Sequence, residues 1–180
     1  MIAIEDRPHP VEIAHAILPP AAAVRRAAAR EGGHLLVFLP GAGEIARLRG
    51  EIGDLAAGGR FDILPLHGSL GAEEQDAALA PSPRRKIVLA TNLAETSLTI
   101  EGVTDVIDTG LARVPRFDPA KGIDRLEVER ISRDCADQRA GRAGRTGPGR
   151  ALRLWGAGED RKSTRLNSSH IQKSRMPSSA

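Results

Sequence analysis

The sequence predicts an α/β domain in which a mostly parallel sheet is covered by helices on both faces. Strand-like apolar runs alternate with helix-like runs between residues 34 and 108, an order that favours parallel strands joined by helical crossovers. The run over residues 34–39 is continuously apolar, as in a strand buried on both faces. Aromatic residues make up only 2% of the chain, so the predicted core is aliphatic.

Each element follows from its local pattern. The expected order is a short strand (11–18), a helix (21–31), a strand (34–39), a helix (42–57), a strand (61–66), a helix (71–79) and strands over 86–90 and 103–108. Pro19-Pro20 breaks the first strand, and Gly32-Gly33 closes the first helix. The helix over 42–57 carries its Ile and Leu residues on one stripe, which predicts a single buried face.

The segment over residues 113–130 interrupts this alternation. Residues 113–117 and 123–129 resemble two strands, and the Asp-Pro-Ala-Lys-Gly sequence over 118–122 is a natural turn between them. We therefore expect an inserted β-hairpin that projects from the domain.

The C-terminal part begins with a helix and ends without periodicity. Ser132 is the expected N-cap of a helix that ends near residues 147–149, and a last strand covers 151–155. The remaining residues, 156–180, are Ser-rich and basic and have no apolar period. We expect this segment to be a disordered or artefactual tail.

Composition and charge exclude several classes of protein. A single cysteine, Cys135, allows no internal disulfide, and no apolar run reaches the length of a membrane span. With no signal-peptide pattern either, a cytoplasmic location is expected. The net charge of +3 arises entirely in residues 156–180, which hold five basic and two acidic groups. The one strongly basic stretch inside the domain, with seven arginines, is 130–153, where we expect an anion to bind.

The segment Gln138-Arg-Ala-Gly-Arg-Ala-Gly-Arg145 carries the strongest chemical signal. On a continuous α-helix, Gln138, Arg142 and Arg145 fall within about 60° of one another, so two guanidiniums and an amide point the same way, as a phosphate-binding face requires. Gly141 and Gly144 are unfavourable in a helix by about 1 kcal/mol each, which suggests that something approaches their backbone closely. The alternative is a solvated Arg-rich helix.

Several segments in a fixed order resemble the motifs of DEAH-box superfamily 2 helicases. They are 138–149, similar to motif VI; 90–102, similar to motif V; 35–41, similar to motif IV; and 66–70, similar to the segment after it. The resemblance covers about residues 8–155. It implies a RecA-like three-layer domain over 21–155, the second of two such domains in an ATP-dependent RNA helicase. Residues 1–20 are then a linker or the end of the preceding domain.

The resemblance also implies roles for individual residues at an ATP site between the two domains. Arg142 and Arg145 correspond to arginine fingers at the γ-phosphate, and Gln138 to a group that binds the phosphate or the attacking water. Ser97 and Glu101 would face the ribose or metal-bound waters. Most ligands of ATP and Mg²⁺ would come from the first RecA-like domain in cis, and no metal site is expected within this chain.

RNA is the polymer that the resemblance implies, held by its backbone. Thr91, Asn92, Gly68 and Ser69 correspond to the groups that contact phosphates and sugars. For Thr91 and Asn92 the sequence alone leaves open an ordinary polar strand end. The hairpin resembles one placed where duplex strands part, although an ordinary β excursion fits it as well.

Two features depart from the family pattern. Leu79 occupies a position where relatives often present an aromatic residue to adenine. The sequence also contains no G-x-x-x-x-G-K-[ST] loop and no DEAH tetrapeptide, so we expect the chain to be inactive alone as a piece of a longer helicase. A standalone RecA-like module that binds RNA or a partner without hydrolysis is the alternative.

Overall fold

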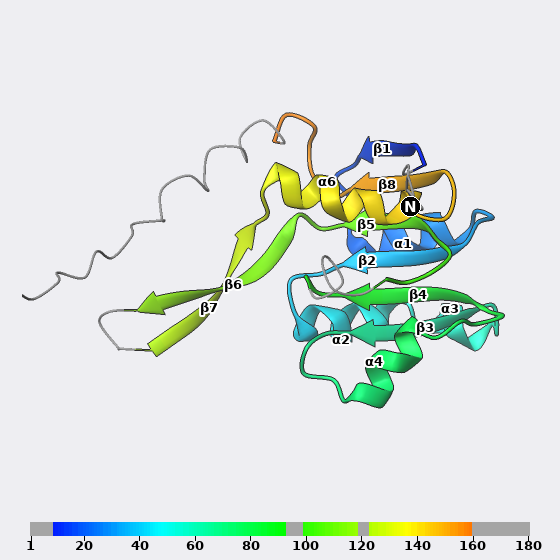
Figure 1. The fold of residues 1–180 in the computed structure, drawn as a ribbon, viewed down its shortest axis with the longest axis horizontal. Coiled ribbons are helices and arrows are strands. Elements are labelled where there is room, and N and C mark those ends of the chain that lie inside the picture. The colour runs from blue at the N-terminus through cyan, green and yellow to red at the C-terminus, as the bar shows by residue number, and fades with distance from the viewer. Residues whose placement is uncertain (1–8, 93–98, 119–122, 160–180) are drawn as a thin grey trace, which may run out of the picture.

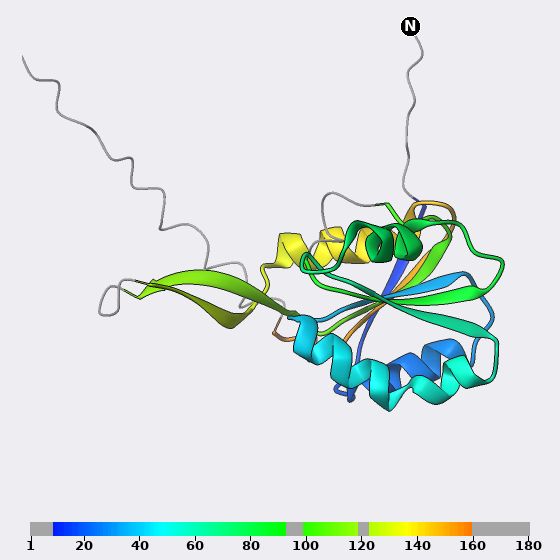
Figure 2. The same cartoon turned by 90° about the horizontal axis from the view of Figure 1, so that it is seen from below.

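The computed structural model describes residues 9–92, 99–118 and 123–159. A six-stranded sheet lies between two layers of helices, and a two-stranded hairpin extends from one end (Figures 1 and 2). The elements are β1 (Val11–His15), α1 (Pro20–Ala28), β2 (His34–Phe38), α2 (Ala42–Glu51), α3 (Gly53–Ala57), β3 (Phe61–Leu66), α4 (Ala72–Leu79), β4 (Arg85–Ala90), β5 (Val103–Asp108), β6 (Leu111–Asp118), β7 (Ile123–Arg130), α6 (Arg133–Gly141), the 3₁₀ turn η1 (Arg142–Gly144) and β8 (Gly149–Arg153). The predicted α/β class is confirmed.

The large sheet has the strand order β1-β8-β5-β2-β4-β3, and every pairing in it is parallel. The apolar run that predicted a doubly covered strand is β2, near the centre of the sheet, with residues 35–38 buried. Because the strands are parallel, their carboxyl ends meet at one edge, where α/β sheets bind ligands.

Two apolar clusters fill the space between the sheet and its helices. One packs α1 and α2 against one face, through residues such as Val24, Ile45 and Leu48. The other packs α4, α6 and η1 against the opposite face, where their buried members are Ala78, Ala140 and Ala143 and the half-buried Leu79 of α4 packs beside them. Figure 2 shows the two helical layers on either side of the sheet. The small alanine side chains let α6 and η1 lie close to β5 and β8.

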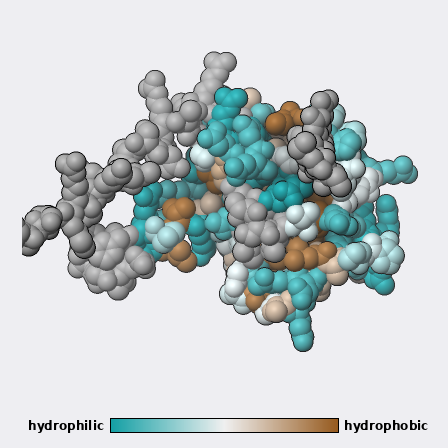
Figure 3. All heavy atoms as spheres, viewed as in Figure 1, coloured by the Kyte–Doolittle hydropathy of each residue, from teal (hydrophilic) through white to brown (hydrophobic). Residues whose placement is uncertain are grey.

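The predicted hairpin forms, and it projects from the domain as a separate two-stranded sheet (Figure 1). Arg116 and Glu129 form a bidentate ion pair across the hairpin, with N–O distances of 2.6 and 2.8 Å. At its base, the Ile131 amide donates to the Gly110 carbonyl at 3.0 Å. The surface in Figure 3 is mainly hydrophilic with separate apolar patches, one of them on the hairpin.

Two helices differ from the sequence prediction. The helix expected over 42–57 is divided at Ile52 into α2 and α3. The helix expected to end near residues 147–149 ends as an α-helix at Gly141. Glycines weaken the helix there, and the carbonyl of Gly144 instead accepts a hydrogen bond from the His9 amide at 2.8 Å. After this turn the chain continues into β8.

The N-terminal segment also contributes to the domain. Residues 1–20 were expected to be a linker or the end of another domain, with a strand over 11–18. The strand is β1, shorter than expected, and it pairs with β8 at the edge of the sheet. The part of the linker that the structure describes is thus built into this sheet.

Candidate functional site

Two loops at the carboxyl ends of β3 and β4 bring together the residues proposed to contact RNA. The Thr91 amide donates to the Leu66 carbonyl at 3.1 Å, which ties the end of one strand to the other. Gly68, Ser69 and Asn92 are exposed there, and Thr91 is half-buried. Four groups from two separate motifs therefore share one edge of the sheet, as the parallel topology predicts.

The turn that follows β3 has an internal polar contact that the sequence did not reveal. The Ser69 hydroxyl lies 2.8 Å from Nδ1 of His67. The Leu70 amide also donates to the His67 carbonyl at 3.1 Å, and the Gln75 side chain donates to the Leu70 carbonyl at 3.0 Å. These bonds hold the turn in a defined shape.

Helix α6 begins at the hairpin and runs across one face of the sheet (Figure 1). Its N-cap is Ser132, as predicted, and the Ser132 hydroxyl accepts a hydrogen bond from the Cys135 amide at 3.3 Å. Asp134 lies in the first turn, where a negative charge is favourable. The helix thus starts at the carboxyl edge and carries the Arg-rich segment toward the amino ends of β5 and β8.

Arg139, which the sequence analysis did not single out, is the most deeply buried arginine of the segment. Its side chain is 0% exposed and forms an ion pair with Asp108 at 2.9 Å. The guanidinium lies 4.7 Å from the ring centre of Phe38 and donates to the Leu111 carbonyl at 3.3 Å. Burial raises the pKa of the Asp108 carboxyl, and the positive charge of Arg139 acts against this rise. Arg139 therefore joins α6, the central strands and the first residue of the hairpin.

The three residues predicted to share a phosphate-binding face have different environments. Gln138 and Arg145 are exposed, whereas Arg142 is buried at 7% exposure. The prediction assumed one continuous α-helix, but α6 ends at Gly141 and the 3₁₀ turn η1 follows it. The continuous helix behind that common face is therefore not observed, and the shared face and the chemical roles of the three residues stay predictions.

Arg145 is held by a hydroxyl group. Its Nη1 donates to the Thr99 Oγ1 at 2.6 Å, and within the described ranges no carboxylate forms an ion pair with it. Thr99 belongs to the segment that resembles motif V, so the contact connects that segment with the Arg-rich one. Glu101, two residues later, is exposed. Ser97 lies outside the described residues.

The two glycines of the Arg-rich segment behave differently. A Cβ on Gly144 would lie 2.5 Å from the carbonyl oxygen of His9 and 2.7 Å from Val11, so the close approach predicted for this glycine comes from the chain itself. Nothing lies within 4 Å of the corresponding position on Gly141.

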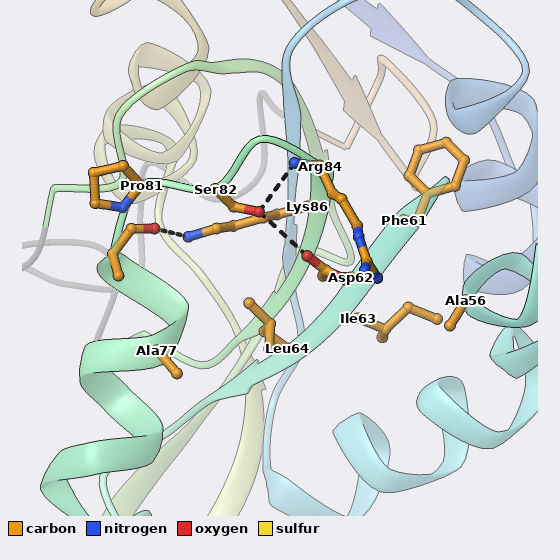
Figure 4. A pocket seen from close by; sticks show the side chains of 11 residues that line it. Ala56, Phe61, Asp62, Ile63, Leu64, Ala77, Pro81, Ser82, Arg84 and Lys86 are labelled. Carbon is orange, nitrogen blue, oxygen red and sulfur yellow. Dashed lines mark hydrogen bonds and ion pairs between the residues drawn. The ribbon is translucent and has the colours of Figure 1, made fainter. Parts of the chain in front are cut away.

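A cleft of about 470 Å³ lies beside the edge strand β3, away from these groups (Figure 4). The Ser82 hydroxyl donates a hydrogen bond to the Asp62 carboxylate at 3.2 Å, and the Lys86 ammonium donates to the Ala78 carbonyl at 3.0 Å. Burial lowers the pKa of Lys86. None of the predicted site residues lines the cleft.

Among the described residues, no group of three or more His, Cys, Asp or Glu is placed to hold a metal ion. None of the helices in that same part of the chain has both the length and the hydropathy of a membrane span.

The chain is similar in sequence to a helicase domain family and to individual helicases. The profile of the helicase conserved C-terminal domain matches residues 20–147. The ATP-dependent RNA helicase HrpB of Escherichia coli K12 is 44% identical over 160 residues, which cover 83% of this chain and 20% of that protein. A putative DEAH-box ATP-dependent helicase of Mycosarcoma maydis is 45% identical over 134 residues, covering 73% of this chain and 9% of that protein. The chain thus spans a fifth or less of these relatives.

Solved structures agree with the sequence relatives. A crystal structure described as the E. coli DExH-box NTPase HrpB is similar with a TM-score of 0.81 and 40% identity, over 93% of this chain and 22% of that one. Another, described as the E. coli DEAH/RHA helicase HrpB, has a TM-score of 0.83 and 40% identity, over 94% and 23%. The predicted RecA-like fold is confirmed.

Proposed function

This chain belongs to the helicase conserved C-terminal domain family, in its DEAH-box form, and on that premise we propose that it is the second RecA-like half of an ATP-dependent RNA helicase. The first RecA-like half, in cis, would supply the phosphate-binding loop that this sequence lacks. In this proposal, residues 21–155, with β1 added at the edge, form the working domain. Most of the tail expected over 156–180 lies outside the described residues.

The environment of Arg145 is the observation that carries this proposal. The side chain is exposed, no described carboxylate neutralises it, and a hydroxyl of the motif V segment holds it at 2.6 Å. A cation kept free of carboxylates suits a group that must meet a phosphate. We assign Arg145 as an arginine finger, which stabilises charge on the γ-phosphoryl group as it is transferred.

The remaining nucleotide contacts surround this residue in the proposal. Arg142, whose side chain is 7% exposed, adds a second positive charge. Gln138 orients the phosphate or the attacking water, and Ser97 and Glu101 face the ribose or metal-bound waters. Mg²⁺ accompanies ATP as part of the substrate, held mainly by groups of the first domain.

The RNA track in this proposal is the loop pair at the carboxyl ends of β3 and β4. Gly68, Ser69, Thr91 and Asn92 are neutral donors and acceptors, which suit contacts to phosphates and sugars without base reading. The chain has few aromatic side chains, so base stacking is not its main contact with RNA. The projecting hairpin would stand where duplex strands separate.

The test is a chimeric helicase in which this chain replaces the matching segment of E. coli HrpB. We expect RNA-stimulated ATP hydrolysis by the chimeric helicase and none by the isolated chain, which lacks a phosphate-binding loop. Hydrolysis by the isolated chain above that of its Arg142/Arg145 double alanine variant would contradict the proposal. An inactive but folded chimera, together with salt-dependent RNA binding by the isolated chain, would favour the standalone binding module.

A further inference from the structure

The turn after β3 presents an exposed hydroxyl group that is hydrogen-bonded to a neighbouring histidine. Ser69 is exposed at the tip of the turn, and its Oγ lies 2.8 Å from Nδ1 of His67. The backbone bond from Leu70 to His67 and the Gln75 side chain hold the turn closed. A serine hydroxyl has one donor hydrogen and two acceptor lone pairs. If Nδ1 accepts that hydrogen, Ser69 presents only lone pairs to a ligand.

The charge around this turn disfavours a phosphate. From His67 to Pro83 the chain has three acidic residues, Glu73, Glu74 and Asp76, and no lysine or arginine. Glu73 and Glu74 are exposed in the first turn of α4, and the Glu74 carboxylate accepts from the Gly71 amide at 3.3 Å. An anion that approached Ser69 would meet these carboxylates, whereas a neutral hydroxyl donor would not be repelled.

We propose that the His67–Ser69 pair recognises the ribose 2′-hydroxyl: Nδ1 of His67 accepts a hydrogen bond from the Ser69 hydroxyl, so Ser69 Oγ accepts a hydrogen bond from the 2′-hydroxyl of RNA. The pair is then a specificity device for RNA over DNA, since the 2′-hydroxyl is the group that distinguishes the two. This inference rests on the proposed function, which places RNA on this edge of the sheet. His67 acts through Ser69 and is a positioning residue.

The experiment compares the affinity of the chimeric helicase for two labelled oligouridine strands, one of RNA and one uniformly 2′-fluoro. Fluorine keeps the ribose-like sugar shape and accepts hydrogen bonds, but it does not donate. We expect RNA to bind more tightly, and Ser69→Ala to reduce the ratio of the two affinities by about two- to tenfold, the value of one hydrogen bond between neutral groups. Ser69→Thr, which keeps the hydroxyl, retains the ratio.

The positioning role of His67 has a separate readout. His67→Phe keeps a ring but removes the acceptor, so the Ser69 hydroxyl is free to donate a hydrogen bond elsewhere. The ratio of the RNA and 2′-fluoro affinities then falls toward that of Ser69→Ala. Thr91→Ala serves as the matched control, because it weakens both strands equally and leaves the ratio unchanged.

Two results would overturn the inference, and they differ from a failure of the proposed function. If Ser69→Ala weakens RNA and 2′-fluoro strands equally, Ser69 donates to phosphate and does not read the sugar. If His67→Phe leaves the ratio at its original value, His67 does not set the direction of the bond. If Ser69→Ala, Thr91→Ala and Asn92→Ala all leave RNA affinity unchanged, RNA does not lie on this edge, and the RNA track itself is wrong.

Discussion

Arg139 and Arg145 belong to one short Arg-rich segment, yet they lie in opposite environments. Arg139, in α6, is fully buried between the Asp108 carboxylate at 2.9 Å and the Phe38 ring at 4.7 Å. Arg145, just beyond η1, is exposed and bound to the Thr99 hydroxyl at 2.6 Å. The change from α-helix to 3₁₀ turn at residue 142 separates the two.

The comparison shows how a single motif divides between folding and chemistry. A buried guanidinium needs a carboxylate partner, because an uncompensated buried charge is very unfavourable. A guanidinium that serves a phosphate must instead remain available. In this account Arg139 stabilises the fold and the base of the hairpin, and Arg145 serves ATP.

The largest expected effect on stability comes from Arg139→Ala. Loss of this side chain leaves the Asp108 carboxylate buried without its ion pair, which destabilises the domain by about 3–5 kcal/mol. The measurement is denaturant unfolding of the isolated chain, followed by the fluorescence of Trp155, the chain's one tryptophan.

A double variant and an exposed pair supply the controls for Arg139. Arg139→Met combined with Asp108→Leu removes both charges, and most of the lost stability should return. Arg25→Ala breaks the exposed pair with Asp54 at 2.6 Å, and we expect little change. If Arg139→Ala were as mild as Arg25→Ala, the buried ion pair would not be a structural element.

Alanine at the two glycines should have opposite effects. Gly144→Ala forces a Cβ to within 2.5 Å of the His9 carbonyl, so the edge of β1 must shift, at about 1–3 kcal/mol. Gly141→Ala meets nothing within 4 Å and should stabilise α6 by about 0.5–1 kcal/mol. Thermal unfolding of both variants checks the pair. Destabilisation by Gly141→Ala would contradict the open space beside this position.

A smaller effect concerns the pH dependence of stability and the half-buried His34 of β2. Burial lowers the pKa of His34, with the charges of Lys86 and Arg85 adding to the effect, and its Nδ1 accepts from the Lys86 amide at 3.1 Å. A lowered folded pKa means that this contribution is present above the unfolded value of about 6.5 and is lost as pH falls through the folded pKa.

The variant His34→Asn tests this pH dependence. Unfolding free energies measured between pH 7 and pH 5 should fall less steeply for His34→Asn than for the original chain. An unchanged slope would mean that His34 does not contribute to the pH dependence of stability.

Much of the fold followed from local patterns in the sequence, because buried parallel strands are continuous apolar runs. Residues 61–66 and 103–108 have the predicted bounds. The end of α6 did not follow, since it depends on a contact between Gly144 and His9 that no local pattern records.

Within the candidate site, the sequence indicated which residue types gather but not how they are paired. Arg139 finds its carboxylate at Asp108, 31 residues earlier in the chain, and an α-helical period placed Arg142 and Arg145 alike although one is buried. Such pairings are decided by packing between distant segments, which a single sequence does not show. The roles of Gln138, Arg142 and Arg145 remain predictions.

RNA-stimulated ATP turnover by the Arg145→Ala variant of the chimeric helicase tests the central claim most directly. Arg47→Ala, an exposed arginine of α2, is the control for the change in charge. We expect Arg145→Ala to unfold at the same denaturant concentration as the unsubstituted chimera and to lose about 10³-fold or more in turnover, while Arg47→Ala keeps its turnover. Turnover by Arg145→Ala equal to that of Arg47→Ala would contradict the division between a structural and a chemical arginine.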